Sequence, residues 1–157
     1  PNNVGRVIRA IEVMEVSGRS IREHEAESLR EPCPYRVIQF GLRYRDRETL
    51  YERINRRVDQ MAEAGLAEEV REARENGLTA TAAQAIGCKE LYGWLDGAET
   101  LDAALEKLKQ STRRYAKRQL TWFGADKRIH WIEPDAQEEG ETPLDRAMKL
   151  LEKEGTA

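Results

Sequence analysis

The chain has 157 residues, a formal net charge of -3, 39% hydrophobic residues and 35% charged residues. This length suits one domain with a sizeable core, and the composition is typical of a water-soluble, helix-rich protein with a charged surface. No apolar run approaches the roughly 20 residues that cross a bilayer, and no signal-peptide pattern is present. We therefore expect a cytoplasmic protein without membrane contact.

Cysteine and histidine are too sparse and too scattered to suggest a zinc site. The two cysteines, Cys33 and Cys88, are not at metal-ligand spacing, and His24 and His130 each stand alone. Free cysteines also fit a reducing compartment. We therefore predict no metal ligands within this chain.

The first predicted element is a helix at the very start of the chain. The chain opens at Pro1 without an initiator methionine and enters helical periodicity at once, which is typical of the middle of a longer protein. Asn2 or Asn3 is suited to cap this helix, and Gly18 is suited to the left-handed position that ends it. Its apolar side chains gather on one side, at Val4, Val7, Ile8, Ile11 and Met14.

The next stretch leads from a charged segment into a strand. Residues 21–30 are charged and without periodicity, so we expect a loop or a short helical turn. Pro32 and Pro34 then hold the backbone extended. Residues 35–42 are rich in strand-forming side chains and predict a β-strand. Asp46 is placed to cap the helix that follows.

A helix is predicted over residues 48–64, and one of its arginines falls among apolar side chains. On a helical projection that starts at Leu50, Arg57 lies at about 340° and Arg53 at about 300°, whereas Arg56 points outward. The apolar stripe consists of Leu50, Ile54, Val58 and Met61. An inward guanidinium costs free energy unless an anion meets it, and this anion is either a structural carboxylate or a bound ligand.

A break in periodicity follows a short helix that is predicted over residues 66–76. Ile86 and Leu91 fall about 140° apart on a helical projection, so one helix does not run through Gly87. This indicates a turn or a distorted helix start, whose small residues let another chain come close. A packed helix then resumes at Leu91 and ends at residues 96–97.

The longest predicted helix, about residues 100–122, ends in a strongly cationic stretch. Residues 112–123 contain four basic side chains and no acidic one. One side of the helix is predicted to pack into the core, through Leu101, Leu105, Leu108, Thr112, Tyr115, Gln119 and Trp122. The opposite side presents Arg114, Lys117, Arg118 and Thr121. Such a face is suited to phosphates, although most charged helix faces are only solvated.

Three elements complete the chain. Residues 128–133 predict a second strand, and residues 135–141 predict an acidic surface loop. Thr142, Pro143 and Asp145 are suited to start a final helix. Its inward side is predicted to consist of Leu144, Met148 and Leu151.

Four of these stretches resemble, in the same order, motifs of the tRNA dimethylallyltransferase family. They are Pro-Asn-Asn-x-x-Arg-Val-Ile-Arg-Ala-Ile-Glu-Val from Pro1, Arg-Ile-x-x-Arg-Val-Asp-x-Met from Arg53, Gln-Ala-Ile-Gly-x-Lys-Glu-Leu from Gln84, and Arg-Arg-Tyr-Ala-Lys-Arg-Gln-Leu-Thr-Trp-Phe from Arg113. The resemblance runs from Pro1 to about Glu133 and corresponds to the C-terminal half of such an enzyme. In the family, the N-terminal half carries a nucleotide-binding P-loop of the ATP-binding type and the Asp expected to act as general base. The present chain contains no G-x-x-x-x-G-K-[ST] motif.

The resemblance implies a mostly α fold with two strands, as the C-terminal portion of an α/β P-loop-type (NTPase-like) parallel-sheet fold. Residues 1–20 would be the end of a helical insertion region. Residues 21–134 would be the C-terminal part of the catalytic core, with helices that contact tRNA. Residues 135–157 would be the acidic loop and the terminal helix.

The activity implied by the resemblance is the transfer of a dimethylallyl group from dimethylallyl diphosphate to N6 of an adenosine next to the tRNA anticodon (position 37). An arginine of the helix over residues 48–64 is then expected to hold the diphosphate. We assign this catalytic role to Arg57, with Arg53 as the second candidate. A Mg²⁺ ion would share the charge of the diphosphate, with ligands largely outside this chain.

By the same resemblance, three groups of residues are expected to bind the tRNA anticodon stem-loop. The first is Asn2, Asn3, Val4, Gly5 and Arg6. The second is Ala83, Gln84, Ala85, Ile86, Gly87 and Cys88. The third is Arg114, Lys117, Arg118, Gln119, Thr121 and Trp122. The chain departs from the family at Cys88, where the family usually carries Tyr, and at Gly124, where it carries Arg.

Because the P-loop and the general base belong to the other half, we expect this chain to be inactive alone, and to be a monomer. Two other interpretations stay open at this stage. One is a helical RNA-binding module without catalysis of its own. The other is a protein-interaction domain whose basic helix face meets an acidic partner. Steep salt dependence of tRNA binding would favour the RNA interpretations.

Overall fold

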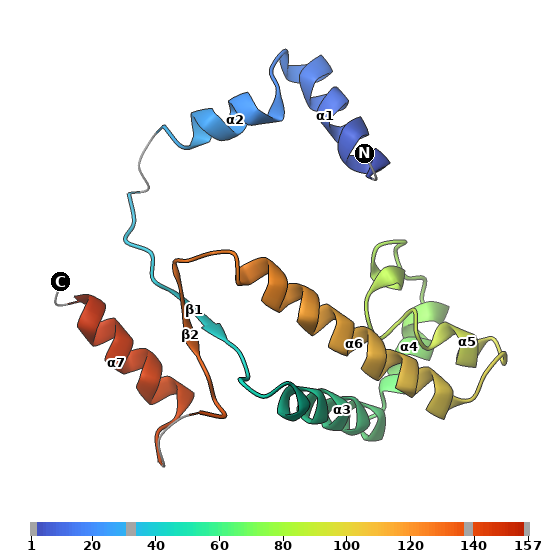
Figure 1. Cartoon of the computed structure of the whole chain (residues 1–157). Coiled ribbons are helices and arrows are strands. Elements are labelled where there is room, and N and C mark those ends of the chain that lie inside the picture. Colours follow the sequence, from blue (N-terminus) through green and yellow to red (C-terminus); the bar gives the residue numbers. More distant parts are fainter. Residues whose placement is uncertain (1–2, 31–33, 137–139, 156–157) are drawn as a thin grey trace. The chain divides into compact units, whose positions relative to one another are not determined.

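The computed structural model describes residues 3–30, 34–136 and 140–155. The chain is mostly helical with two strands, as predicted (Figure 1). It divides into two compact units, Pro1–Val37 and Ile38–Ala157. Asn2, Pro32 and Cys33, which the sequence assigned to a cap and to an extended segment, lie outside the described residues. In the part that is described, no helix combines the length and the apolar character that a membrane span needs.

The first unit consists of helices α1 (Val4–Ser17) and α2 (Ile21–Ser28). Asn3 caps α1, since its Oδ1 accepts a hydrogen bond from the backbone N–H of Arg6 at 3.1 Å. Gly18 ends the helix at φ 68°, as predicted. The apolar side chains of α1 border a hollow of about 510 Å³ between the two helices, and they keep much of their surface exposed within this unit.

Residues 21–30, for which we expected a loop or a short helical turn, contain the eight-residue helix α2. Its start is fixed by a capping box, in which Ser20 accepts from the backbone N–H of Glu23 and the Glu23 carboxylate accepts from Ser20. The Arg19 guanidinium also forms an ion pair at 2.5 Å with Glu27 in the last turn of the helix. The prediction relied on apolar periodicity, which an exposed helix held by its cap and by ion pairs does not need.

The second unit contains a pair of parallel strands, β1 (Gln39–Leu42) and β2 (Ile129–Ile132). Gln39 is opposite Ile129 and Leu42 is opposite Ile132. The strand predicted over residues 35–42 is therefore confirmed only in its second half. The side chain of Phe40 is 36% exposed and that of Leu42 is 62% exposed, so the strand pair presents apolar surface to its surroundings.

Side chains of β2 pack closely against the backbone of Gly41. A Cβ atom at this position would lie 2.7 Å from Cζ3 of the Trp131 ring and 2.9 Å from Cγ2 of Ile129. We expect Gly41→Ala to lower the free energy of unfolding by about 1–3 kcal/mol, because the indole must move out of its packed position. Urea denaturation measures this change. Gly155→Ala, where a Cβ meets no atom within 4 Å, is the control, and equal stability of the two variants would contradict the prediction.

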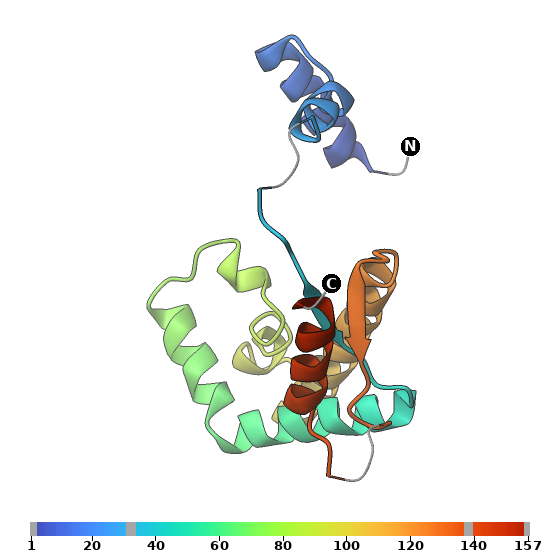
Figure 2. The ribbon, with the colours of Figure 1, turned by 90° about the vertical axis from the view of Figure 1, so that its left-hand side faces the viewer.

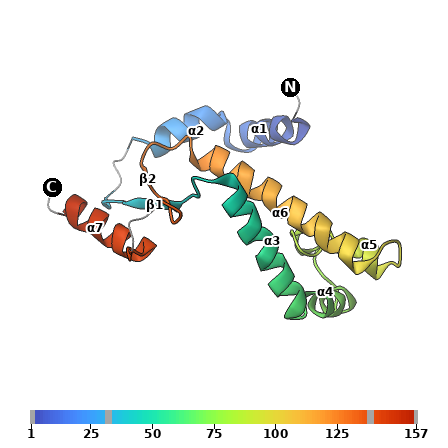
Figure 3. The ribbon, with the colours of Figure 1, turned by 60° about the horizontal axis from the view of Figure 1, so that its bottom comes forward.

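The core of this unit lies between helices α3 (Arg47–Glu63) and α6 (Leu101–Phe123), which run side by side (Figures 1 and 3). Asp46 caps α3, as predicted, and Thr100 caps α6. The shorter helices α4 (Leu66–Glu75) and α5 (Tyr92–Leu95) and a 3₁₀ turn (Ala82–Gln84) close the core at one end. The buried apolar side chains of this core are Val58, Leu66, Val70, Leu91, Ala104 and Leu108.

Helix α7 (Pro143–Gly155) lies next to β2 (Figure 2). Its start is held by Thr142 and Asp145, which accept hydrogen bonds from each other's backbone N–H. The predicted inward residues Leu144, Met148 and Leu151 are exposed instead. The more buried positions are Ala147, Leu150 and Glu154, about 100° away around the helix. The periodicity was read correctly, but the apolar stripe is not the side that packs on β2.

Candidate nucleic-acid interface

The C-terminal half of α6 presents a cationic face whose charges are not used inside the protein. Arg114, Lys117 and Arg118 are exposed, as predicted. Within the described residues none of the three forms an ion pair with a carboxylate, and the Arg118 guanidinium lies over the ring of Tyr115 at 5.7 Å. The three cations therefore remain available to an anion from outside.

Basic side chains elsewhere in the second unit behave differently, because many of them are paired with acids. These pairs are Arg43 and Arg45 with Glu133, Arg71 with Glu68, Arg74 with Asp96, Lys107 with Glu99, Lys109 with Asp59, and Arg128 with Asp126. The pairing with Arg128 also lowers the pKa of Asp126 to about 2. The α6 face differs from these sites, because its three cations have no acidic partner within the described residues.

The packed stripe that was predicted for α6 is wrong in its second half. Tyr115 is 45% exposed and Trp122 is 72% exposed, and Gln119 is exposed as well. Packing continues instead through Ala116 and Leu120. The predicted stripe used alternating steps of four and three, a repeat of 3.5 residues, which drifts by about 20° per seven residues against a straight α-helix.

This correction enlarges the cationic face. Trp122 follows Arg118 by one turn, so its exposed indole lies on the same side of α6 as the guanidinium. Thr121 is exposed beside it, with its hydroxyl donating to the backbone carbonyl of Lys117 at 2.9 Å. An exposed aromatic ring among unpaired cations is the combination that stacks nucleic-acid bases and binds the adjoining phosphates.

The fourth cation of the stretch, Arg113, turns inward and is structural. Its guanidinium donates to Oδ1 of Asn55 on α3 and lies over the ring of Tyr51 at 5.9 Å. Together with the ion pair between Lys109 and Asp59 at 2.8 Å, this contact fixes the register of α3 against α6.

Arg57 and Arg53 are both exposed, so the predicted inward position of Arg57 is wrong. The packed side of α3 also includes Tyr51, Asn55 and Ala62, which moves its centre to about 80° on the projection from Leu50. Within the described residues Arg57 has no hydrogen-bond or ion-pair partner, whereas the Arg53 guanidinium lies over the ring of Tyr44 at 5.5 Å. The first of the two alternatives, a structural carboxylate beside Arg57, is therefore not what the described residues contain.

The segment around Gly87 has the predicted form of a turn before a helix. The 3₁₀ turn Ala82–Gln84 is followed by non-helical turns, and Gly87 is buried at φ 110°, a backbone conformation that favours glycine. Ala83, Ile86 and Cys88 are half-buried, whereas Gln84 and Ala85 are exposed. Only part of this predicted tRNA-binding group is thus accessible from outside in this unit.

A buried carboxylate, which sequence reasoning did not single out, holds this turn in place. Glu90 is 8% exposed, and its Oε2 accepts a hydrogen bond from the backbone N–H of Gly87 at 2.9 Å. The Lys89 ammonium lies 4.0 Å from its other oxygen. The sequence contains one indication of this contact, an acidic residue directly before Leu91 in a segment that was predicted to pack.

Replacing Glu90 by leucine should lower the free energy of unfolding by about 1–3 kcal/mol, because the buried Gly87 N–H loses its acceptor. Glu90→Gln keeps an acceptor oxygen and is expected to stay within about 1 kcal/mol of the original chain. Urea denaturation of both variants tests this. A leucine variant as stable as the glutamine variant would show that the hydrogen bond contributes nothing.

The predicted residues Asn3, Val4, Gly5 and Arg6 belong to the first unit and are exposed at the start of α1. The Asn3 side chain is already engaged as the helix cap, through the N–H of Arg6. Asn2 lies outside the described residues. The predicted tRNA-binding residues thus come from three separate elements, of which α6 alone offers a cluster of unpaired cations within one face.

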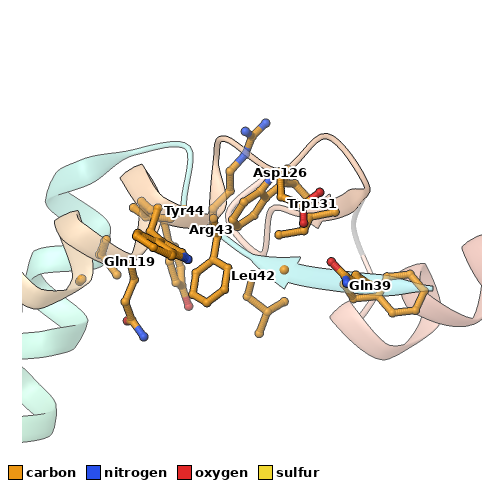
Figure 4. Close-up of a pocket in the computed structure, with 15 residues that line it drawn as sticks. Gln39, Leu42, Arg43, Tyr44, Gln119, Asp126 and Trp131 are labelled. Atoms are coloured by element: carbon orange, nitrogen blue, oxygen red, sulfur yellow. The ribbon is translucent and has the colours of Figure 1, made fainter. Parts of the chain in front are cut away.

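A hollow of about 700 Å³ lies beside the strand pair, where sequence reasoning placed no site (Figure 4). It is lined from β1 and the residues after it, from the C-terminal part of α6, and from the β2 segment. Among its lining residues are Leu42, Tyr44, Gln119, Asp126 and Trp131. Gln119 and Trp122 therefore border this hollow as well as the cationic face. In the described parts of the chain, no group of three His, Cys, Asp or Glu side chains is arranged to hold a metal ion.

The second unit is thus mostly helical with a pair of parallel strands, and the C-terminal half of α6 carries exposed cations without acidic partners within the described residues. The comparisons with known proteins identify the family. The chain belongs to the IPP transferase family, whose model matches residues 1–126.

Among its relatives, the chain is 48% identical to the tRNA dimethylallyltransferase of Desulforamulus reducens, over 96% of this chain and 53% of that protein. It is 48% identical to the tRNA dimethylallyltransferase of Bacillus subtilis, over 85% of this chain and 42% of that protein. The solved structure of tRNA delta(2)-isopentenylpyrophosphate transferase from Staphylococcus epidermidis matches all of this chain and 50% of that one, with a TM-score of 0.69 and 36% identity. The full-length tRNA isopentenylpyrophosphate transferase from Bacillus halodurans matches 99% of this chain and 48% of that one, with a TM-score of 0.68 and 40% identity. The chain thus spans about half the length of the relatives that it matches.

Proposed function

We propose that this chain forms the tRNA-binding half of a tRNA dimethylallyltransferase. The reaction transfers a dimethylallyl group from dimethylallyl diphosphate to N6 of the adenosine next to the tRNA anticodon. The observation that carries the tRNA-binding role is the face of α6, where Arg114, Lys117 and Arg118 stand without acidic partners beside the exposed Trp122. Membership of the IPP transferase family and relatives named tRNA dimethylallyltransferases support the reaction class.

In this proposal, the cationic face binds the phosphates of the anticodon stem-loop and Trp122 stacks on an unpaired base. The target adenosine must leave the base stack, at a cost of a few kcal/mol, and tRNA binding supplies that free energy. The turn that Glu90 holds is the proposed neighbour of the flipped nucleotide. Its exposed members are Gln84 and Ala85.

The transfer itself forms a bond between N6 and the allylic carbon and breaks the bond between that carbon and the diphosphate oxygen. The amine proton leaves to a general base, which we place outside this chain. Arg57 is the proposed partner of the leaving diphosphate, since its guanidinium is exposed and has no partner within the described residues. A guanidinium that pairs with the diphosphate stabilises the negative charge that grows on it as the bond breaks.

The same proposal extends to the rest of the fold. Two strands are fewer than a stable sheet usually has, and parallel sheets are usually covered on both faces, whereas Phe40 and Leu42 are exposed here. These features support a P-loop-type half that supplies further strands. Residues 21–134 would then be the C-terminal part of the catalytic core. Within the described residues no three His, Cys, Asp or Glu side chains are arranged to hold a metal ion, and we place the ligands of Mg²⁺ largely in the other half. With tRNA as the substrate, we place the protein in the cytoplasm.

Two measurements test the proposal. First, the 157-residue chain should bind a tRNA anticodon stem-loop with an affinity that falls steeply as salt rises. Second, the N-terminal part of the Bacillus subtilis relative that this chain does not match can be joined to this chain. The joined protein, called the joined enzyme below, should transfer radiolabelled dimethylallyl groups to tRNA. Binding without transfer would favour a non-catalytic RNA-binding module. Salt-independent or absent binding would overturn both the proposed enzyme half and the RNA-binding module.

A further inference from the structure

A groove between the first turn of α3 and the C-terminal half of α6 brings one further cation without an acidic partner within the described residues, Arg47, to the same site as Lys117. The groove has a volume of about 250 Å³. It is lined by Arg47, Leu50 and Tyr51 from α3 and by Lys117, Leu120 and Thr121 from α6. Within the described residues, neither the Arg47 nor the Lys117 side chain has a hydrogen-bond or ion-pair partner. One wall therefore carries a free guanidinium and the other a free ammonium.

Two other sets of polar groups at the groove, the N–H groups at the start of α3 and the Thr121 hydroxyl, are already engaged. The N–H groups at the start of α3 donate to Asp46, with 2.8 Å between Thr49 N and the Asp46 carboxylate. The Thr121 hydroxyl donates to the backbone carbonyl of Lys117. The donors left for a ligand are thus the two cationic side chains and the hydroxyl of Tyr51, above a floor that includes Leu50 and Leu120. Such a site suits a small anion with several acceptor oxygens that both cations reach at once.

The position of the groove indicates which kind of anion it binds. Lys117 is shared between the groove and the row formed by Arg114 and Arg118 on the α6 face. A nucleic-acid backbone that follows this row therefore passes the mouth of the groove. We propose that the groove holds one phosphodiester of the RNA backbone between Arg47 and Lys117. This inference rests on the proposed function, and it extends the tRNA-binding surface from α6 to α3.

The test compares variants of the 157-residue chain for binding to a fluorescent tRNA anticodon stem-loop over a range of KCl concentrations. Arg47→Ala is expected to weaken binding roughly five- to tenfold and to reduce the slope of log K against log salt by about 0.7–0.9, the value of one phosphate contact. Arg47→Lys should keep the slope, because the charge stays. Arg56→Ala is the matched control: Arg56 is an exposed arginine of the same helix, which points away from α6 and does not line the groove.

A double-mutant cycle adds a second readout. If Arg47 and Lys117 hold the same phosphate, the loss of affinity in the double alanine variant should be smaller than the two single losses combined. An Arg47→Ala variant with the salt slope of Arg56→Ala would overturn the groove and leave the proposed function standing. A chain that does not bind the stem-loop at all would overturn the proposed function, and the groove with it.

Discussion

Arg57→Ala in the joined enzyme is expected to slow dimethylallyl transfer about 10²- to 10³-fold, while tRNA affinity stays close to normal. The magnitude is that of one preorganised group removed from the charge that develops in a transition state. The position of Arg57 makes the variant informative. The side chain is exposed and has no partner within the described residues, so its loss should not destabilise the fold. The effect would then belong to the reaction and not to packing.

Steady-state kinetics with varied dimethylallyl diphosphate measure this prediction. Arg56→Ala removes the same charge from the adjacent position and should leave donor use unchanged. Arg53→Ala is expected to have an intermediate effect, because its guanidinium is already engaged over the ring of Tyr44. Unaltered donor use by Arg57→Ala would rule out this residue, and a large loss in Arg53→Ala alone would move the role to Arg53.

Local chemistry was sufficient to predict where helices begin and end. Asp46 and Thr142 start their helices in the structure as predicted, because a cap depends on a few neighbouring residues. The missed helix α2 follows the same logic, since Ser20 and Glu23 form a capping box that was present in the sequence. Apolar periodicity does not indicate this helix, because its side chains are exposed.

The direction in which helices face was harder to predict, and the errors share a cause. In α7 the predicted stripe, which includes Leu144, is about 100° away from the side that packs. In α3 and α6 the packed sides are displaced from the predicted stripes, which exposes Arg57 and Trp122. A helix face is set by the elements against which it packs, and these lie far away in sequence. In addition, a stripe counted in sevens drifts along a helix of 23 residues.

The hollow beside the strand pair and the groove at Arg47 depend on contacts between distant segments. Gly41 meets Trp131 across a register that joins residues about ninety positions apart, and Arg47 and Lys117 line one groove only because α3 and α6 run side by side. No local pattern contains either pairing. The cationic face of α6, in contrast, was predictable from local sequence, because Arg114, Lys117 and Arg118 lie within about one turn of the same helix.

Replacing Lys117 and Arg118 together by alanine is expected to raise the Michaelis constant for tRNA in the joined enzyme roughly 10- to 100-fold. Two phosphate contacts would be lost, so the slope of log K against log salt should fall by about 1.4–1.8. The turnover number at saturating tRNA should change little, because neither side chain is assigned to the reacting atoms. This pattern is the opposite of that expected for Arg57→Ala.

The control for this prediction is the pair Lys107→Ala and Arg56→Ala, which removes two positive charges from exposed positions outside the α6 face. A general effect of net charge would raise the Michaelis constant for tRNA equally in both double variants. A specific effect of the α6 face would raise the Michaelis constant for tRNA only when Lys117 and Arg118 are replaced.

Trp122→Ala tests the second component of the face, because stacking on a base is worth about 1–3 kcal/mol and changes little with salt. If the Trp122 variant loses affinity at an unchanged salt slope while the Lys117 and Arg118 variant loses slope, charge and stacking act as distinct parts of one tRNA-binding surface.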